Sequence, residues 1–94
     1  MRIIGFIWLE DIVEKLWRKH HVEQYEVEEV FGNHPYFRFV ENGYRVGEDV
    51  YAALGQTDGG RYLVVFFVHK ADGRALIVSA RDMTQAERRH YEKR

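Results

Sequence analysis

Four side chains in this sequence have the chemical types that metal-free cleavage of RNA requires: His20, Glu48, Arg61 and Arg81. Such a reaction needs a base that takes the proton from a 2′-hydroxyl and an acid that protonates the leaving 5′-oxygen. It also needs cations that stabilise the negative charge growing on the phosphorane. A histidine or a carboxylate can act as the base, and arginines can hold the phosphate. We therefore take these four residues as candidate catalytic residues.

Each of the four residues also has an ordinary structural interpretation. His20 falls at the end of a predicted helix, where its ring suits a partly buried, hydrogen-bonded position. Glu48 suits a solvated strand residue, and Arg61 suits the cap of a turn. Arg81 suits an ion pair with Glu87 or with the aspartate beside it. The residue types alone leave both interpretations open.

The C-terminal end of the sequence places Arg81 between a strand and a helix with a well-defined start. Thr84 and Glu87 have the spacing of a capping box, in which the hydroxyl accepts a backbone hydrogen bond and the carboxylate reaches back. We expect this strand over 74–80 and the helix over 85–92. A helix that begins this firmly can hold an arginine at the preceding strand end rigidly.

The rest of the chain divides into helices followed by strands. Apolar residues recur at helical spacing over 9–20 and 23–31, and the period then changes to that of strands. The pair Asn42-Gly43 predicts a two-residue hairpin turn. Further strands are expected over 36–41, 44–54 and 61–69, and residues 3–8 form either a short strand or an apolar lead-in. In the strand 44–54, the residues predicted to share one face are Val46, Val50, Ala52 and Leu54.

This order of elements predicts an α+β fold with two N-terminal helices, a four-stranded antiparallel meander sheet and a C-terminal helix. The strand 61–69 is almost continuously apolar, as expected of a central strand covered on both faces. A chain of 94 residues fits one domain, spanning 1–94. The absence of cysteine excludes disulfides and fits a reducing cytoplasm. The longest apolar run is too short to span a bilayer.

The charge distribution favours a phosphate-binding C-terminal part. Residues 1–58 carry 6 Lys and Arg against 11 Asp and Glu, whereas residues 59–94 carry 8 against 4. A basic half can hold phosphates, although the two halves can also simply attract each other. No histidine pair has the spacing of a zinc site, and no nucleotide-binding glycine motif is present, so we expect no metal and no cofactor.

Aromatic residues in the predicted strands suggest two uses. Stacking against RNA bases is one, and packing across neighbouring strands is the other and the more frequent. The residues concerned are Tyr36, Phe37, Phe39, Tyr44 and Tyr51.

Motifs along the whole chain resemble those of the BrnT family of type II toxins. Near the N-terminus, Phe6-x-Trp8 and Lys19-His20-x-Val22 stand at the separations usual in that family. The most specific match is the C-terminal cluster of Ser79-Ala80-Arg81, Glu87-Arg88-Arg89 and Tyr91. Weaker matches are Glu29, Phe31, Glu48, Gly55, Gly60-Arg61 and the apolar run Leu63 to Phe66.

The resemblance implies a RelE-like fold and a ribonuclease that cuts translated messages without a metal, which inhibits translation. It also implies a small DNA-binding antitoxin, encoded next door, that neutralises the toxin by tight association. A dimer of the chain or a heterotetramer with the antitoxin are the assemblies left open. We expect phosphate contacts, which add salt-dependent affinity, from Lys19, Arg74, Arg88, Arg89 and Lys93.

The chain departs from the family pattern at positions that affect its chemistry. Val50 and Leu76 stand where arginines are usual, Leu9 replaces an aspartate, and Ile12 replaces a lysine. A glycine usual after the Lys-His pair is replaced by His21. These substitutions motivate a second hypothesis, in which the chain is a catalytically weakened or inactive member that binds a protein or RNA.

Overall fold

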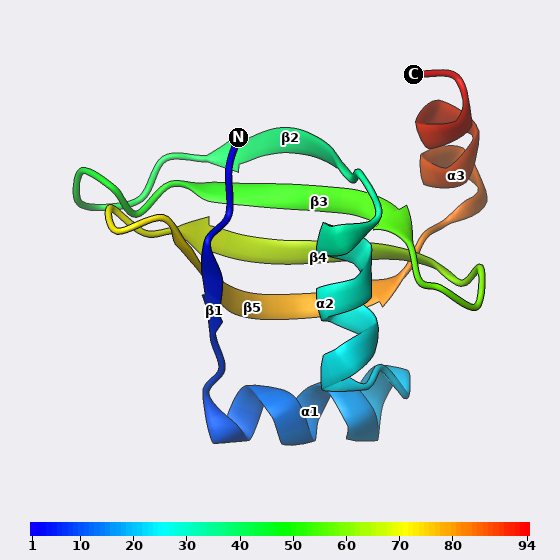
Figure 1. Ribbon diagram of the computed structural model, residues 1–94, viewed down its shortest axis with the longest axis horizontal. Coiled ribbons are helices and arrows are strands. Elements are labelled where there is room, and N and C mark those ends of the chain that lie inside the picture. Colours follow the sequence, from blue (N-terminus) through cyan, green and yellow to red (C-terminus); the bar gives the residue numbers. More distant parts are fainter.

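The computed structural model describes residues 1–94, which form five strands and three helices. The strands are β1 (Gly5–Ile7), β2 (Tyr36–Glu41), β3 (Val50–Gln56), β4 (Tyr62–His69) and β5 (Arg74–Asp82). The helices are α1 (Glu10–His20), α2 (Gln24–Gly32) and α3 (Gln85–Glu92). The strands make one sheet in the order β1-β5-β4-β3-β2 (Figure 1).

The sheet has one strand more than the four-stranded antiparallel meander that the sequence predicts. Strands β2 to β5 form the predicted meander, and β1 pairs in parallel with β5, from Gly5 opposite Arg74 to Ile7 opposite Leu76. Of the two interpretations of residues 3–8, the short strand is therefore confirmed. A strand of three residues carries no periodic signal, and its partner lies at the far end of the chain, so local patterns do not reveal the pairing.

The predicted two-residue turn at Asn42-Gly43 is wrong. Strand β2 ends at Glu41 and β3 begins only at Val50, so residues 42–49 form a longer loop in which Val46 is fully exposed. Gly43 does not make a hairpin turn. Glycine is required at this position because a Cβ would lie 2.1 Å from the carbonyl oxygen of Glu48. The predicted strand 44–54 is corrected accordingly.

Helices α1 and α2 cover one face of the sheet, and the main core lies beneath them (Figure 1). Leu16, Val27 and Val30 of these helices pack with strand residues such as Phe67 and Ile77, all of them buried. Strand β4 is buried on the helix-covered face through Leu63, Val65 and Phe67, whereas on the other face only Val64 is buried, so the prediction of a strand covered on both faces holds only in part. None of the three helices has the length and apolarity needed to cross a membrane.

The other face of the sheet is covered only at one end, by α3. Tyr91 of α3 packs over Ala52, Leu54 and Val64. The alternation of side chains along the paired strands places a further set of residues on this same face, beyond α3. We call this set the open face; its members are Val50, Phe66, Val68, Leu76, Ser79 and Arg81.

Phe67 is the central side chain of the main core, since it is fully buried and its ring contacts those of Phe31, Phe37 and Tyr51. We expect Phe67→Ala to lower the free energy of unfolding by about 3–5 kcal/mol, because the lost contacts leave a cavity. Urea denaturation followed by circular dichroism measures this loss. Phe39→Ala is the matched control, since Phe39 is 51% exposed, and a similar loss in both variants would contradict this account of the core.

Candidate functional site

The four predicted catalytic residues do not meet in one place. Arg61 and Arg81 lie near the end of the sheet where β4 begins and β5 ends, whereas Glu48 precedes β3 at the opposite end. The β3–β4 pairing runs from Val50 opposite Val68 to Gln56 opposite Tyr62, a length of roughly 20 Å at the rise of a strand. His20 ends α1, on the helix-covered face.

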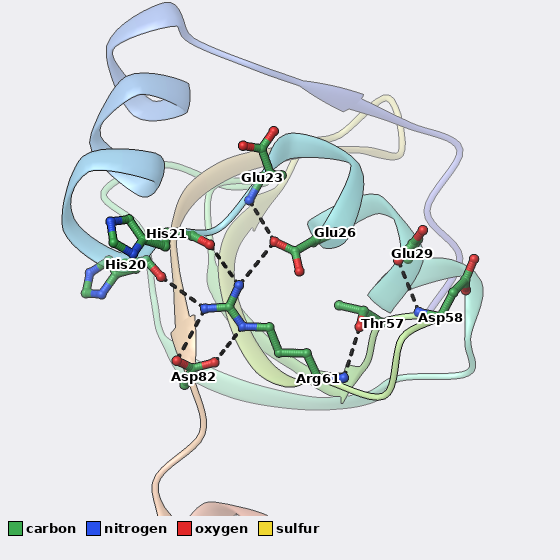
Figure 2. Close-up of polar contacts among 9 residues, drawn as sticks. All are labelled: His20, His21, Glu23, Glu26, Glu29, Thr57, Asp58, Arg61 and Asp82. Carbon is green, nitrogen blue, oxygen red and sulfur yellow. Dashed lines mark hydrogen bonds and ion pairs between the residues drawn. The ribbon is translucent and has the colours of Figure 1, made fainter.

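Arg61 uses all five of its N–H donors within the protein (Figure 2). Nε and Nη2 donate to the two carboxylate oxygens of Asp82, at 2.8 and 3.3 Å. Nη1 donates to the His21 carbonyl oxygen at 2.8 Å and to Glu26 at 3.1 Å. Nη2 also donates to the His20 carbonyl oxygen at 3.0 Å. No N–H group of Arg61 is left for a phosphate.

These bonds make Arg61 the junction between four elements. The carbonyl groups of His20 and His21 are at the end of α1, where backbone acceptors lack partners within the helix. Glu26 belongs to the first turn of α2, and Asp82 ends β5. The hydrogen bond with Asp82 is the main cause that raises the pKa of Arg61 above its ordinary value. His20 thus enters the network through its backbone, and its ring does not contact the guanidinium (Figure 2).

The turn before Arg61 is fixed by its own hydrogen bonds. The Arg61 backbone N–H donates to the Thr57 hydroxyl at 3.0 Å, and the Asp58 N–H donates to Glu29 of α2 at 3.0 Å (Figure 2). Thr57 is buried despite its polarity. The turn therefore holds the start of β4, and with it the Arg61 side chain, against α2.

Arg81 differs from Arg61 because part of its guanidinium has no protein partner. Nη1 and Nη2 donate to the two oxygens of Glu87, at 2.7 and 3.0 Å, and Nη1 also donates to the Asp82 carbonyl oxygen at 3.2 Å. Nε–H and the second N–H of Nη2 remain free. The guanidinium lies 5.6 Å from the centre of the Phe66 ring on the open face. The predicted Arg81–Glu87 ion pair and a role in binding are thus compatible.

Glu87 connects Arg81 to the start of α3. Its Oε1 accepts the Thr84 N–H at 2.8 Å, and the Thr84 hydroxyl accepts the Glu87 N–H at 3.1 Å, which confirms the predicted capping box. The hydrogen bonds from Arg81, and then those from Thr84, lower the pKa of Glu87 to about 2. The carboxylate is therefore charged at every pH at which the protein would act.

A pocket of about 570 Å³ lies at the other end of the open face, beside Glu48. Its lining includes Val50, Val68 and Leu76, and Lys70 donates to the Glu48 carboxylate at 3.5 Å. Two of these apolar residues, Val50 and Leu76, stand at the positions where the resemblance implies arginines. The pocket therefore combines two carboxylates, Glu41 and Glu48, and one cation with an apolar floor.

The sequence interpretation missed Lys70. The pairing of β3 with β4 places Val50 opposite Val68, and the same register continued by two residues brings position 48 opposite position 70. The short connection between the two strands, residues 57–61, sets this register, and the register identifies Lys70 as the partner of Glu48.

The predicted RNA-binding cations lie in separate regions. Lys19 is exposed near the end of α1, and Arg74 pairs with Asp72 in the turn before β5. On α3, Arg88 stacks 3.9 Å from the centre of the Tyr62 ring, whereas Arg89, like Lys93 just after the helix, is exposed without an ion pair. These α3 cations flank the end of the sheet that carries Arg81.

Most of the candidate stacking aromatics pack against other rings. Phe37 and Tyr51 contact Phe67, Phe39 contacts Tyr51, and the remaining strand residue, Tyr36, contacts the ring of His90. Only Tyr44 is fully exposed. No group of three or more His, Asp or Glu side chains is arranged to hold a metal ion.

The Arg61 junction predicts a stability defect when its side chain is replaced. We expect Arg61→Ala to lower the free energy of unfolding by on the order of 2–4 kcal/mol, because two helix-end carbonyls lose their donor and Glu26 and Asp82 lose their ion pair. Arg61→Lys should be nearly as destabilised, since an ammonium cannot reproduce the planar fork. Urea denaturation measures both losses.

Arg74→Ala is the control for this measurement. The side chains of Arg74 and Asp72 are both about half exposed, so removing this ion pair should change the free energy of unfolding little. Equal stability of Arg61→Ala and the unmodified chain would show that the junction does not hold the fold together.

The Glu87 pKa predicts a pH dependence of stability. Because the folded-state pKa of about 2 lies below the ordinary value of 4.5, the stabilisation is complete above pH 4.5 and disappears as the pH falls through about 2. Its size should be on the order of 2 kcal/mol, reduced by solvent around Arg81, whose side chain is 35% exposed. Denaturation of Glu87→Gln from pH 2 to 7 isolates the effect, and a constant difference from the unmodified chain would contradict it.

The fold is shared with a solved toxin. The crystal structure of the Brucella abortus ribonuclease toxin BrnT superposes with a TM-score of 0.60, covering 86% of this chain and 97% of that chain at 17% sequence identity. At this identity the likeness concerns the fold alone. No curated protein sequence matches the chain.

The sequence itself carries the family relationship. The family described as "Ribonuclease toxin, BrnT, of type II toxin-antitoxin system" matches residues 8–87. This span includes the Trp8 and Lys19-His20 motifs near the N-terminus and ends at Glu87, the residue that binds Arg81. Since the match covers most of the chain, the protein belongs to the BrnT family of ribonuclease toxins of type II toxin–antitoxin systems.

Proposed function

We propose that this chain is a toxin that cleaves RNA on the open face of its sheet. The observation that supports this most strongly is Arg81, which keeps two N–H donors free on that face while Glu87 holds the rest of its guanidinium. Paired parallel N–H groups match the oxygens of a phosphate. Arg81 would therefore bind a backbone phosphate of the RNA, beside the aromatic ring of Phe66.

The chemical step would take place beside Glu48 and Lys70. In this proposal the Glu48 carboxylate takes the proton from a 2′-hydroxyl, and the oxygen attacks the adjacent phosphate. The Lys70 ammonium stabilises the charge on the phosphorane and gives a proton to the leaving 5′-oxygen. The chain's own side chains thus supply base, acid and cation, without a metal.

Arg81 would bind a different phosphate from the one that is cut. Along β4, Val68 beside the pocket and Val64 opposite Arg81 are roughly 13 Å apart, so one RNA strand would span both positions. Arg88, Arg89 and Lys93 would extend the phosphate contacts on α3. His20 and Arg61 lie on the helix-covered side and serve the fold in this mechanism.

Membership of a toxin–antitoxin family implies an antitoxin partner. We propose that this antitoxin is a small DNA-binding protein that neutralises the toxin, and that the toxin acts in the cytoplasm by limiting translation. The acidic N-terminal half, with 11 Asp and Glu among residues 1–58, would suit a basic partner surface.

Induced expression of the chain alone in a bacterial host tests the proposal. We expect growth arrest and decay of total RNA from the unmodified chain, and loss of both in Arg81→Ala, Glu48→Gln and Lys70→Ala. Arg18→Ala, on the exposed side of α1, is the control and should remain toxic. Unimpaired growth from folded, unmodified protein would refute the ribonuclease proposal.

The second candidate function is binding without cleavage, and the apolar floor of the Glu48 pocket favours it. Val50 and Leu76 remove two cations from beside the predicted base, and Lys70 alone remains there. If the chain is not toxic because of these replacements, the double variant Val50→Arg with Leu76→Arg should acquire RNA cleavage in vitro. No gain of cleavage would mean that activity depends on more than these two positions.

A further inference from the structure

We propose that Glu87 is the positioning residue of the Arg81 phosphate site, and that it makes Arg81 and helix α3 one rigid phosphate-binding unit. The inference rests on the proposed function only in that Arg81 takes a phosphate. It adds a role for a carboxylate that contacts no RNA itself. The effect of Glu87 on phosphate affinity can be measured. If Glu87 did not position Arg81, its negative charge beside the phosphate site would weaken phosphate binding.

The geometry of the ion pair leaves one edge of the guanidinium available. Glu87 accepts from Nη1 and Nη2, the edge farthest from the backbone, and the Asp82 carbonyl accepts the other Nη1 proton. The remaining Nε–H and Nη2–H lie side by side on the adjacent edge. Two parallel donors of this kind form a fork for two phosphate oxygens.

Arg61 shows what the same edge does when an acceptor is present. There Nε and Nη2 donate to both oxygens of Asp82, at 2.8 and 3.3 Å. In Arg81 the equivalent edge has no carboxylate. The chain thus contains one arginine whose fork is occupied internally and one whose fork is held in place and left free.

The same carboxylate fixes Arg81 and the start of α3 together. Glu87 Oε1 accepts from Arg81 Nη1 at 2.7 Å and from the Thr84 backbone at 2.8 Å. Helix α3 is in turn anchored by Tyr91, which is buried against the sheet, and by Glu92, which accepts the Tyr62 hydroxyl at 3.1 Å. The free fork and the cations of α3 therefore keep a constant relative position.

Positioning acts through side-chain entropy. A free arginine loses rotamer freedom when it is fixed, and Glu87 imposes most of this loss before a ligand binds. Preorganisation of one such side chain contributes about 0.5–1.5 kcal/mol to affinity, which is about two- to tenfold. Against this, the negative charge of Glu87 repels a phosphate. If Glu87 positions Arg81, removing its charge should weaken phosphate binding. If Glu87 acts only as a negative charge, removing that charge should strengthen phosphate binding.

Two substitutions separate the two halves of the capping box. Glu87→Gln keeps a side chain that can cap α3, since Gln serves at this position of a capping box, but it removes the charge that holds Arg81. Thr84→Ala removes the hydroxyl cap and leaves the Glu87–Arg81 pair. Thr84→Ala therefore weakens the cap at least as much as Glu87→Gln does while it keeps the pair, so it is the control that separates loss of the cap from loss of the pair.

The experiment is NMR of the arginine Nε–H groups in the 15N-labelled full chain, titrated with inorganic phosphate and with a short single-stranded RNA oligonucleotide. The Arg81 signal is identified by its absence in Arg81→Lys. We expect a sharp Arg81 signal in the unmodified chain that shifts with both ligands. In Glu87→Gln the signal should broaden and the affinity fall by about two- to tenfold, while Thr84→Ala stays within about twofold.

Three outcomes would overturn the inference. Unchanged or tighter binding by Glu87→Gln would show that Arg81 acts as a charge without positioning. A fall of equal size in Thr84→Ala would assign the effect to the helix cap. No shift of the Arg81 signal in the unmodified chain would mean that the fork takes no phosphate. By contrast, Glu87-dependent binding in a chain that is not toxic would support the inference and refute only cleavage.

Discussion

The guanidinium of Arg61 is the contact on which the arrangement of the other elements depends. It joins the end of α1, the first turn of α2, the start of β4 and the end of β5 through five hydrogen bonds. Two of its acceptors, the helix-end carbonyls of His20 and His21, would otherwise require solvent or another donor. Because a guanidinium presents its donors in a fixed plane, these elements can meet here in only one relative orientation.

The two arginines at this end of the sheet show how partners decide the role of a residue type. Arg61 faces carboxylate and carbonyl oxygens on every side, and all its donors are used within the fold. Arg81 is on the opposite face, where Glu87 and one carbonyl take three of its donors. Both were equal candidates by residue type. Arg61 has an internal acceptor for each of its five N–H groups, whereas Arg81 has acceptors for only three. Only Arg81 therefore has N–H groups available to a ligand.

The open face has two chemically different ends. Near α3 it carries Arg81 and the cations of the helix, which suit the backbone of a nucleic acid. Near the 42–49 loop it carries the Glu48–Lys70 pair above an apolar floor of Val50, Val68 and Leu76. A nucleic acid held at the first end would reach the second. In the proposed mechanism Lys70 is the only cation at that second end, because it is the only one that lines the pocket.

The sequence by itself determined the local structure and the family: both N-terminal helices, the central strand β4, and the capping box of α3, with Glu87 or Asp82 as the ion-pair partner of Arg81. These features depend on residues within a few positions of each other or on a period. The tertiary structure alone decided the parallel pairing of β1, the long 42–49 loop, the five partners of Arg61 and the proximity of Lys70 to Glu48. Each of these joins residues distant in the chain. Their contacts depend on strand register and on packing across the sheet, which no local spacing encodes.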